Sequence, residues 1–292
     1  MDVKELEKKW GRCTIHLASK DRHSEVAVCL QSLRTQTYQA FDLIILDDAS
    51  GTQLISHHPS MSLVQRMKFE GHKIKLLRNN FSNGICAARN KLILEDDFEN
   101  PLTFRVDDDC IYEPDYIERL VKILEKGYSI ATGIVPVTSM PEFERENKFI
   151  GDVIARHELD EVGNIIERKD ELGMSYLSEG IYLCDQFRTS CLYLSKLHKE
   201  IKYPSHVLSF VSFREELWFS FQAILKGYKI GCDVKAKAFH NVCPSGGTRV
   251  PEYSNKVLLD EQTTNKQVKE WFLTFGNFLK KYHEDNLNAN TN

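Results

Sequence analysis

Short apolar runs rich in β-branched residues alternate with helix-like segments along this sequence, from residue 13 to residue 137. The strand-like runs are CTIHLAS, FDLIILDDAS, KIKLLRNN, PLTFRVDDD and YSIATGIVPV. Between them lie SEVAVCLQSLRTQ, NGICAARNKLILED and PDYIERLVKILEKG, in which apolar residues recur at helical spacing. A strand followed by a helix and another strand places the strands parallel and the helix on a face of the sheet. The pattern therefore predicts an α/β protein with a mostly parallel central sheet and helices on both faces.

Carboxylates follow two of the predicted strands at the point where each strand ends. Asp47 and Asp48 close the second apolar run, and Asp107, Asp108 and Asp109 close the fourth. In sheets of this kind, ligands bind beyond the carboxyl ends of the strands. Three adjacent carboxylates repel one another, and a bound divalent cation such as Mg²⁺ would offset that repulsion. The alternative for the same residues is a solvated turn that caps the following segment.

The sequence argues against several other nucleotide and metal sites. It contains neither G-x-x-x-x-G-K-[ST] nor G-x-G-x-x-G, so a phosphate would have to be held by a metal rather than by a glycine-rich loop. A calcium loop of the EF-hand type that starts at Asp107 would need glycine at its sixth position, where Tyr112 stands. The acidic cluster therefore favours a hard cation bound together with a phosphate-bearing ligand.

Composition indicates the expected environment of the protein. The eight cysteines are scattered without a C-x-x-C pair, and several lie inside apolar runs, so we expect reduced thiols. The N-terminus is too charged for a signal peptide, and no apolar run approaches the roughly 20 residues of a membrane span. A formal net charge of -4 argues against a general nucleic-acid-binding surface. We therefore expect a cytoplasmic protein without a transmembrane segment.

Six segments, in their order and spacing, resemble glycosyltransferase family 2, the nucleotide-sugar enzymes of GT-A fold. They are TIHLASKDR, LIILDDAS, NNFSNGICAARN, FRVDDDCIYEPD, REELWFSFQAILKGYKIG and AFHNV, within residues 12–243. The resemblance implies a Rossmann-like GT-A domain over residues 1–250. Its nucleotide-sugar-binding half would span residues 12–137, and its acceptor and catalytic-base half, with a small acceptor-side extension, residues 138–250. Residues 251–292 are expected to form an amphipathic helix and a flexible tail.

The resemblance assigns a nucleotide-sugar pocket to the residues that match the family's short motifs. These are Ser19, Asp21, Arg22, Asp47, Asp48, Asn83, Gly84, Arg89, Asp107 and Asp108. Asp48 would accept a hydrogen bond from a uracil-type base, with Asp47 as the near alternative. Arg89 would pair with phosphate or hold the acids in place. Lys20 and Asp21 depart from the T-x-N-R turn that the family usually has here.

The same resemblance implies a divalent metal, Mn²⁺ or Mg²⁺, because Asp107 and Asp109 match the family's D-x-D motif. Asp109 is the expected direct ligand, and Asp107 would bind a sugar or ribose hydroxyl or the water shell of the metal. His240, in AFHNV, stands where many family members place a further metal or phosphate ligand. A lone histidine is equally well explained as a structural group.

The segment REEL begins a predicted helix and carries two candidate catalytic bases. Glu215 and Glu216 stand 12 and 11 residues before Gly227, and Glu216 matches the position of the family's usual base, an aspartate. Because Glu is longer than Asp by one methylene, Glu215 stays an alternative. Without the resemblance, two acids in a first helical turn would be explained by the helix dipole.

Together these residues predict a metal-dependent glycosyltransferase. It would move a sugar from a nucleoside-diphosphate sugar, a UDP-sugar, to an acceptor hydroxyl by inversion, with Glu216 as base. The acceptor could be a glycan, a lipid, a protein or a modified nucleobase. A sugar-1-phosphate nucleotidylyltransferase is disfavoured because ASKDR lacks the glycines of that class, and a non-catalytic sugar-nucleotide-binding module because Asp107, Asp109 and Glu216 are intact.

Three segments outside these motifs carry further predictions. DEVGN, within the charged stretch 140–180, predicts a hairpin turn in the acceptor-side extension. CPSGGTRVP, at 243–251, predicts a mobile lid because paired glycines are flanked by prolines. The C-terminal helix has an apolar side, for which core packing or homodimerisation is favoured over a membrane interface. Its residues are Val268, Trp271, Phe272, Phe275, Phe278, Leu279 and Tyr282.

Overall fold

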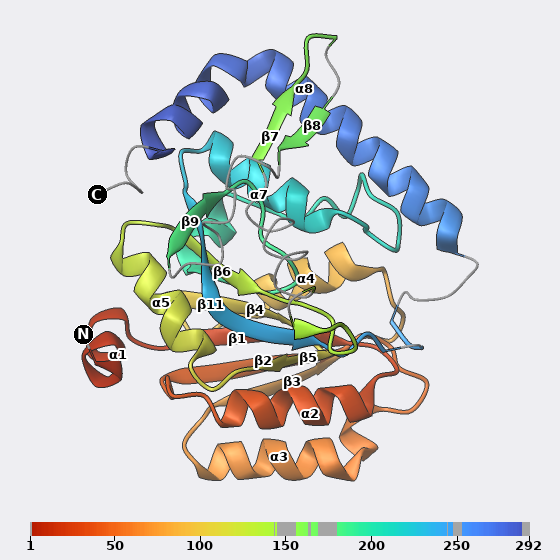
Figure 1. Ribbon diagram of the computed structural model, residues 1–292. Helices are drawn as coiled ribbons and strands as arrows, with labels where there is room; N and C mark the ends of the chain where they lie inside the picture. The colour runs from red at the N-terminus through yellow and green to blue at the C-terminus, as the bar shows by residue number, and fades with distance from the viewer. Residues whose placement is uncertain are drawn as a thin grey trace.

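A nine-stranded sheet with helices on both faces organises the part of the chain that the structure describes (Figure 1). This structure is a computed structural model, and it describes residues 2–142, 144, 156–162, 165–168, 180–243, 245–247 and 253–287. The strands of the sheet are β1 (Cys13–Ser19), β2 (Phe41–Asp47), β3 (Ile74–Arg78), β4 (Leu102–Asp107), β5 (Cys110–Tyr112), β6 (Ile130–Ile134), β9 (Ile181–Cys184), β10 (Cys191–Leu194) and β11 (Ile230–His240). The helices are α1 (Val3–Trp10), α2 (His23–Arg34), α3 (His58–Phe69), α4 (Ile85–Leu94), α5 (Tyr116–Glu125), α7 (Glu215–Leu225) and α8 (Ser254–Leu287), with short 3-10 helices η1 (Leu54–Ser56) and η3 (Ser195–Lys199).

The strand order is β3-β2-β1-β4-β10-β6-β11-β5, with β9 beside β11. Strands β3, β2, β1 and β4 are parallel neighbours, and so are β6 and β11. This confirms the predicted mostly parallel α/β sheet. The alternation did not predict β10, which runs antiparallel between β4 and β6. Because β10 is reversed, its first residues lie at the edge where β1 and β4 end.

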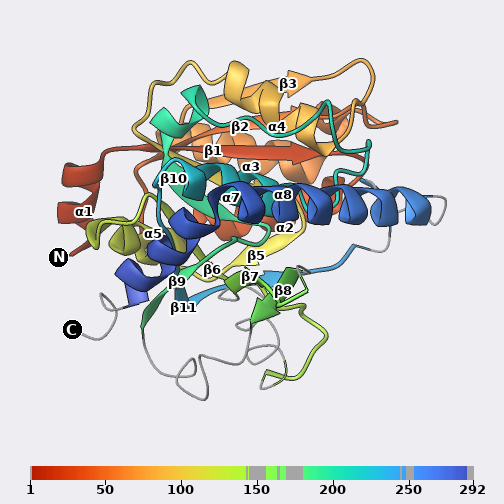
Figure 2. The same cartoon turned by 90° about the horizontal axis from the view of Figure 1, so that it is seen from above.

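The two faces of the sheet are covered by different helices. Helices α2, α3 and α5 lie on one face, and α4, α7 and α8 on the other (Figures 1 and 2). Strand β2 is buried along its whole length: Leu43 and Ile45 pack on the first side, and Ile44 and Leu46 contact α4 on the second. A strand covered on both faces explains a near-continuous apolar run.

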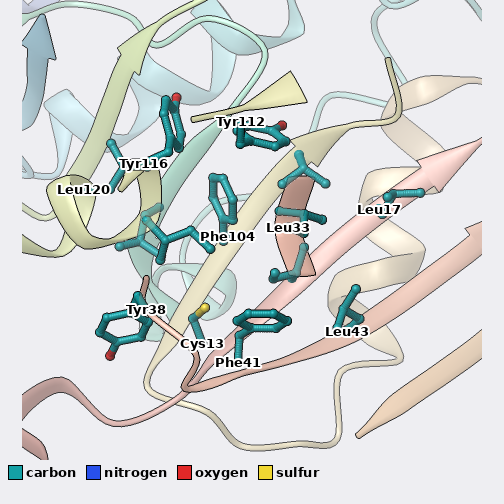
Figure 3. Packing of buried hydrophobic residues seen from close by; sticks show 14 of the residues in the cluster. Cys13, Leu17, Leu33, Tyr38, Phe41, Leu43, Phe104, Tyr112, Tyr116 and Leu120 are labelled. Carbon is teal, nitrogen blue, oxygen red and sulfur yellow. The ribbon is translucent and has the colours of Figure 1, made fainter. Parts of the chain in front are cut away.

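Aromatic side chains of β4, β5 and α5 meet in the core on the first face (Figure 3). Phe104 of β4 meets Tyr112 of β5 edge to face, with ring centroids 5.5 Å apart. The ring centroid of Tyr112 lies 5.1 Å from that of Tyr116, the first residue of α5. These contacts connect β4, the turn after it and α5, and so hold the acidic segment 107–109 between buried anchors.

Helix α8 packs across α7 on the second face (Figure 1). Its Trp271 stacks on Phe221 of α7 at a centroid distance of 5.7 Å. Val268, Phe272, Leu279 and Tyr282 are buried, which confirms core packing for most of the predicted apolar side. Phe275, where the helix bends, and Phe278 stay partly exposed. Homodimerisation through this helix stays a prediction.

Strands β7 (Arg156–Leu159) and β8 (Ile165–Arg168) pair antiparallel and confirm the two arms of the predicted hairpin. Part of its turn, the tail at 288–292 and the domain boundary at residue 250 lie outside the described residues. All eight cysteines are buried, and their reduced state stays a prediction.

Candidate functional site

A cleft of about 780 Å³ opens where the predicted site residues gather. Parallel pairing sets Ser19 of β1 beside Asp47 of β2, and Ala18 beside Asp107 of β4. The first turn of α7 and the segment before β10 reach the same edge. The predicted site residues that line the cleft are Ser19, Arg22, Asp48, Gly84, Arg89, Asp107, Asp108, Asp109, Glu215, Glu216 and His240. Three predicted residues do not line it: Asp21, Asp47 and Asn83.

Asp47 does not line the cleft, and its hydrogen bonds order the loop after β2. Its carboxylate accepts the backbone N–H groups of Ser50 and Leu54, each at 2.9 Å, and pairs with Arg78. Burial alone would raise the pKa of Asp47, but these hydrogen bonds and Arg78 outweigh it and hold the pKa below its usual value. The turn-capping explanation therefore applies to Asp47 and leaves Asp48 as the aspartate of this pair in the cleft.

Asp48 is buried at the cleft wall and accepts hydrogen bonds from Asn79 Nδ2 at 2.5 Å and from the Ser82 hydroxyl. Asp21 lies on the surface, where its carboxylate accepts the Gly51 N–H at 2.7 Å and joins two loops. The two residues thus have different surroundings, although both were assigned to the same pocket.

Two buried arginines balance the three consecutive aspartates. Arg22 Nη1 lies 3.1 Å from a carboxylate oxygen of Asp108 and 3.1 Å from one of Asp109. Arg89 pairs with Asp107 and donates to the Val106 carbonyl at 2.7 Å. Burial raises the pKa of Asp108 to about 6, opposed by Arg22 and assisted by Asp109. The two arginines therefore offset part of the repulsion between the three aspartates.

The two donors best placed for a metal are Asp109 and His240. Antiparallel pairing of β11 with β5 sets His240 opposite Cys110, and His240 Nε2 lies 3.1 Å from Asp109 Oδ1. Asp107 lies with Arg89 instead. Over the described ranges, no three His, Cys, Asp or Glu side chains are grouped to hold a metal. A carboxylate and an imidazole beside an open cleft nevertheless fit a Mn²⁺ or Mg²⁺ ion whose other ligands are phosphate and water.

Glu215 and Glu216 begin α7 and have different surroundings. Glu215 is 3% exposed and forms a two-pronged ion pair with Arg105, at 2.5 and 3.2 Å. Burial raises the pKa of Glu215, and the Arg105 guanidinium opposes that rise. The Glu216 side chain is 29% exposed, lines the cleft, and lies 3.8 Å from Arg105. Of the two, Glu216 is therefore the carboxylate accessible to a substrate.

Arg105 is a buried site residue that the sequence analysis missed. It is 2% exposed within β4, and its guanidinium lies 5.2 Å from the Phe187 ring centroid and 5.6 Å from that of Tyr203. It also lies 3.8 Å from Asp107. The available signal was a charged residue at the centre of PLTFRVDDD, since a buried cation needs a buried partner.

The glycine pair of the predicted lid packs against Arg22. Arg22 donates to the carbonyls of Ser245 and Gly246 at 3.2 and 3.3 Å, and the Gly247 N–H donates to the Lys20 carbonyl at 2.8 Å. Pro244 and residues 248–251 lie outside the described residues, so the lid stays a prediction.

A family model, described as glycosyl transferase family 2, matches residues 14–181, which is more than half of the chain. The chain belongs to glycosyltransferase family 2. The match covers Ser19, Asp48 and Asp107 to Asp109, which lie at the ends of strands β1, β2 and β4 or directly after them. It ends before α7, so Glu216 and His240 lie outside it. A search of curated protein sequences found no match.

Solved structures of glycosyltransferases share the fold of this family 2 chain. The crystal structure of GalNAc-T7 with UDP, GalNAc and Mn²⁺ matches with a TM-score of 0.64 at 14% identity, over 94% of this chain and 54% of that chain. Two crystal structures of S. aureus TarS, one of residues 1–349, match with TM-scores of 0.54 and 0.53 at 13% and 14% identity. They cover 80% and 78% of this chain, and 37% and 60% of theirs. This chain thus spans less than two thirds of each neighbour, and the likeness confirms the GT-A fold.

In the part of the chain that the structure describes, no helix combines the length and the apolar character needed to cross a membrane. The cytoplasmic location stays a prediction.

Proposed function

We propose that this chain transfers a sugar from a UDP-sugar to an acceptor hydroxyl with inversion of the anomeric centre. The observation that carries the proposal is the arrangement of the cleft. Asp48, Asp109 and His240 lie where strands end, and the accessible carboxylate of Glu216 lines the same cleft from α7. A nucleotide-sugar donor bound by Asp48, Asp109 and His240 could therefore meet, in this cleft, an acceptor bound beside Glu216.

On the donor side, Asp48 would accept a hydrogen bond from the nucleoside, and the Ser19 hydroxyl would donate one to it. Asp109 and His240 would hold Mn²⁺ or Mg²⁺, which when bound neutralises negative charge on the diphosphate leaving group. The choice of UDP and a divalent metal is supported by the UDP and Mn²⁺ named for the GalNAc-T7 structure. Arg22 and Arg89 hold the aspartates in place and add positive charge beside them.

On the acceptor side, Glu216 would take the proton of the acceptor hydroxyl while that oxygen attacks the anomeric carbon. The bond from the anomeric carbon to the diphosphate oxygen breaks as the new glycosidic bond forms, and the nucleoside diphosphate leaves. Glu215 stays buried on Arg105 and keeps the first turn of α7 against β4.

Calorimetry with UDP tests the donor half of this proposal. We expect UDP to bind wild-type protein more tightly with Mn²⁺ or Mg²⁺ present, and the metal dependence to disappear in Asp109→Asn. Asp97→Asn, at an exposed ion pair with Lys75, is the matched control and should bind like wild type. Equal affinity of wild-type protein for UDP with and without metal would contradict the proposal.

A further inference from the structure

Asp260 of α8 is a buried carboxylate whose hydrogen bonds converge on one loop. It is 1% exposed and accepts the backbone N–H of Ser209 at 2.6 Å and that of Phe213 at 2.8 Å. It also accepts the Ser209 hydroxyl at 2.9 Å. The next residue of the helix, Glu261, pairs with Arg214 at 3.4 Å. One turn of α8 is thus connected to the segment 209–214.

This segment forms a wall of the cleft and leads directly into α7. Val211, Ser212, Phe213 and Arg214 all line the cleft. Ser212 and Arg214 have φ of 55° and 68°, in the left-handed region that non-glycine residues adopt only when their surroundings hold them. The hydrogen bonds from Ser209 and Phe213 to Asp260 hold this backbone conformation from the side of α8.

The opposite side of the segment rests on the start of α4. The Cys86 N–H donates to Ser212 Oγ at 3.3 Å. Gly84 has a φ of 90°, and a Cβ at this position would lie 2.3 Å from the Phe210 carbonyl oxygen. The segment is therefore held between α4 and α8 with little freedom to shift.

The place of this wall relative to the proposed chemistry indicates what it binds. The proposed donor groups lie at the strand ends, so the acceptor would approach through the part of the cleft beside Glu216, which lies two residues after the end of the segment. Phe213 is 39% exposed, and Tyr253, just before α8, and Val257 of α8 also line the cleft. Phe213 and Tyr253 give this wall aromatic surface beside the polar Ser212 and Arg214, and such a combination fits an acceptor that presents a ring face together with hydroxyl groups, such as a sugar ring.

We propose that Asp260 is a positioning residue for acceptor binding, and that α8 completes the acceptor side of the cleft by fixing the segment 209–214. This inference rests on the proposed function. It assigns a role in the site to a helix that lies outside the stretch matched by the family model.

The test uses the full chain, the UDP-sugar that wild-type protein turns over, and p-nitrophenyl glycosides as acceptors. In Asp260→Asn an NH₂ group replaces one carboxylate oxygen. An NH₂ group cannot accept a hydrogen bond, so part of the hydrogen bonding from Ser209 and Phe213 is lost. We expect the acceptor KM to rise about tenfold or more, because the wall is displaced, while kcat and the Kd for UDP change by less than about threefold. Asp260→Ala, which removes both acceptors, should raise the acceptor KM further.

His283→Gln is the matched control. His283 Nε2 lies 2.7 Å from the buried carboxylate of Asp185, so it also anchors α8 to the body, but away from the segment 209–214. It should lower the melting temperature without changing the acceptor KM. If Asp260→Asn lowers only the melting temperature while wild-type protein performs transfer, the inference is overturned and the proposed function stands. If wild-type protein turns over none of a panel of UDP-sugars, the proposed function fails and the inference with it.

Discussion

Among single residues, Arg105 connects β4 to α7 through its ion pair with Glu215. Arg105→Met leaves Glu215 buried without its partner, so we expect the free energy of unfolding to fall by about 3–5 kcal/mol. Urea unfolding measures this change. The matched control is Arg34→Met, which breaks the exposed pair with Glu70. Exposed pairs contribute little, so the control should stay close to wild type. A loss in Arg105→Met no larger than in the control would contradict the role given to this pair.

Gly84 gives a second prediction at the residue scale. Gly84→Ala places a Cβ 2.3 Å from the Phe210 carbonyl oxygen and must displace the segment 209–214. Gly127→Ala is its control, because Gly127 has a similar φ of 85° but no atom within 4 Å of the added Cβ. Both variants place a side chain at positive φ, and the ψ of 172° at Gly84 adds to the cost because this region is essentially restricted to glycine. Thermal melting should show a clearly larger loss for Gly84→Ala, and equal losses would show that close approach of Phe210 does not matter.

Between elements, η3 packs His198 against β1, and this contact gives a pH dependence. The His198 ring stacks on His16 at a centroid distance of 5.5 Å, and its Nε2 lies 2.9 Å from the Tyr193 hydroxyl. Burial, with His16 next in importance, lowers the pKa of His198 to about 3. In the unfolded chain the pKa of a histidine is about 6.5. Between these values the unfolded state binds a proton that the folded state does not.

The sign follows from linkage: stability must fall as the pH drops below about 6.5, by at most about 1.4 kcal/mol per pH unit from this residue. His198→Gln removes this titration. We expect the free energy of unfolding, measured in urea from pH 7 to pH 4.5, to depend less steeply on pH in this variant. A variant profile parallel to that of wild type would exclude His198 as a source of the acid sensitivity.

For the molecule as a whole, local pattern predicted the elements but not every pairing. The parallel arrangement of strands β1 to β4 could be predicted, because strands that alternate with helices give a regular pattern of apolar residues. The insertion of β10 between β4 and β6 gives no such pattern in the sequence. Its residues, CLYL, have the composition of any short buried strand, and contacts with residues far along the chain decide its direction.

The candidate site divides in the same way. The acids were found because they end predicted strands, but sequence could not separate Asp47 from Asp48, since their different surroundings arise from Arg78, Asn79 and the loop after β2. Asp260 could not be found at all, because its partners are about 50 residues away and meet it only when α8 packs on α7.

The central claim is that Glu216 acts as the base of an inverting glycosyl transfer, and the kinetics of Glu216→Gln test it most directly. With the UDP-sugar and acceptor that wild-type protein uses, kcat should fall about 10² to 10⁴-fold while the Kd for UDP stays unchanged. NMR of the wild-type product should show an anomeric configuration opposite to that of the donor. Glu215→Gln is the adjacent control; its main effect should be on stability. A Glu216→Gln variant with wild-type kcat, or a product that retains the configuration of the donor, would contradict the account.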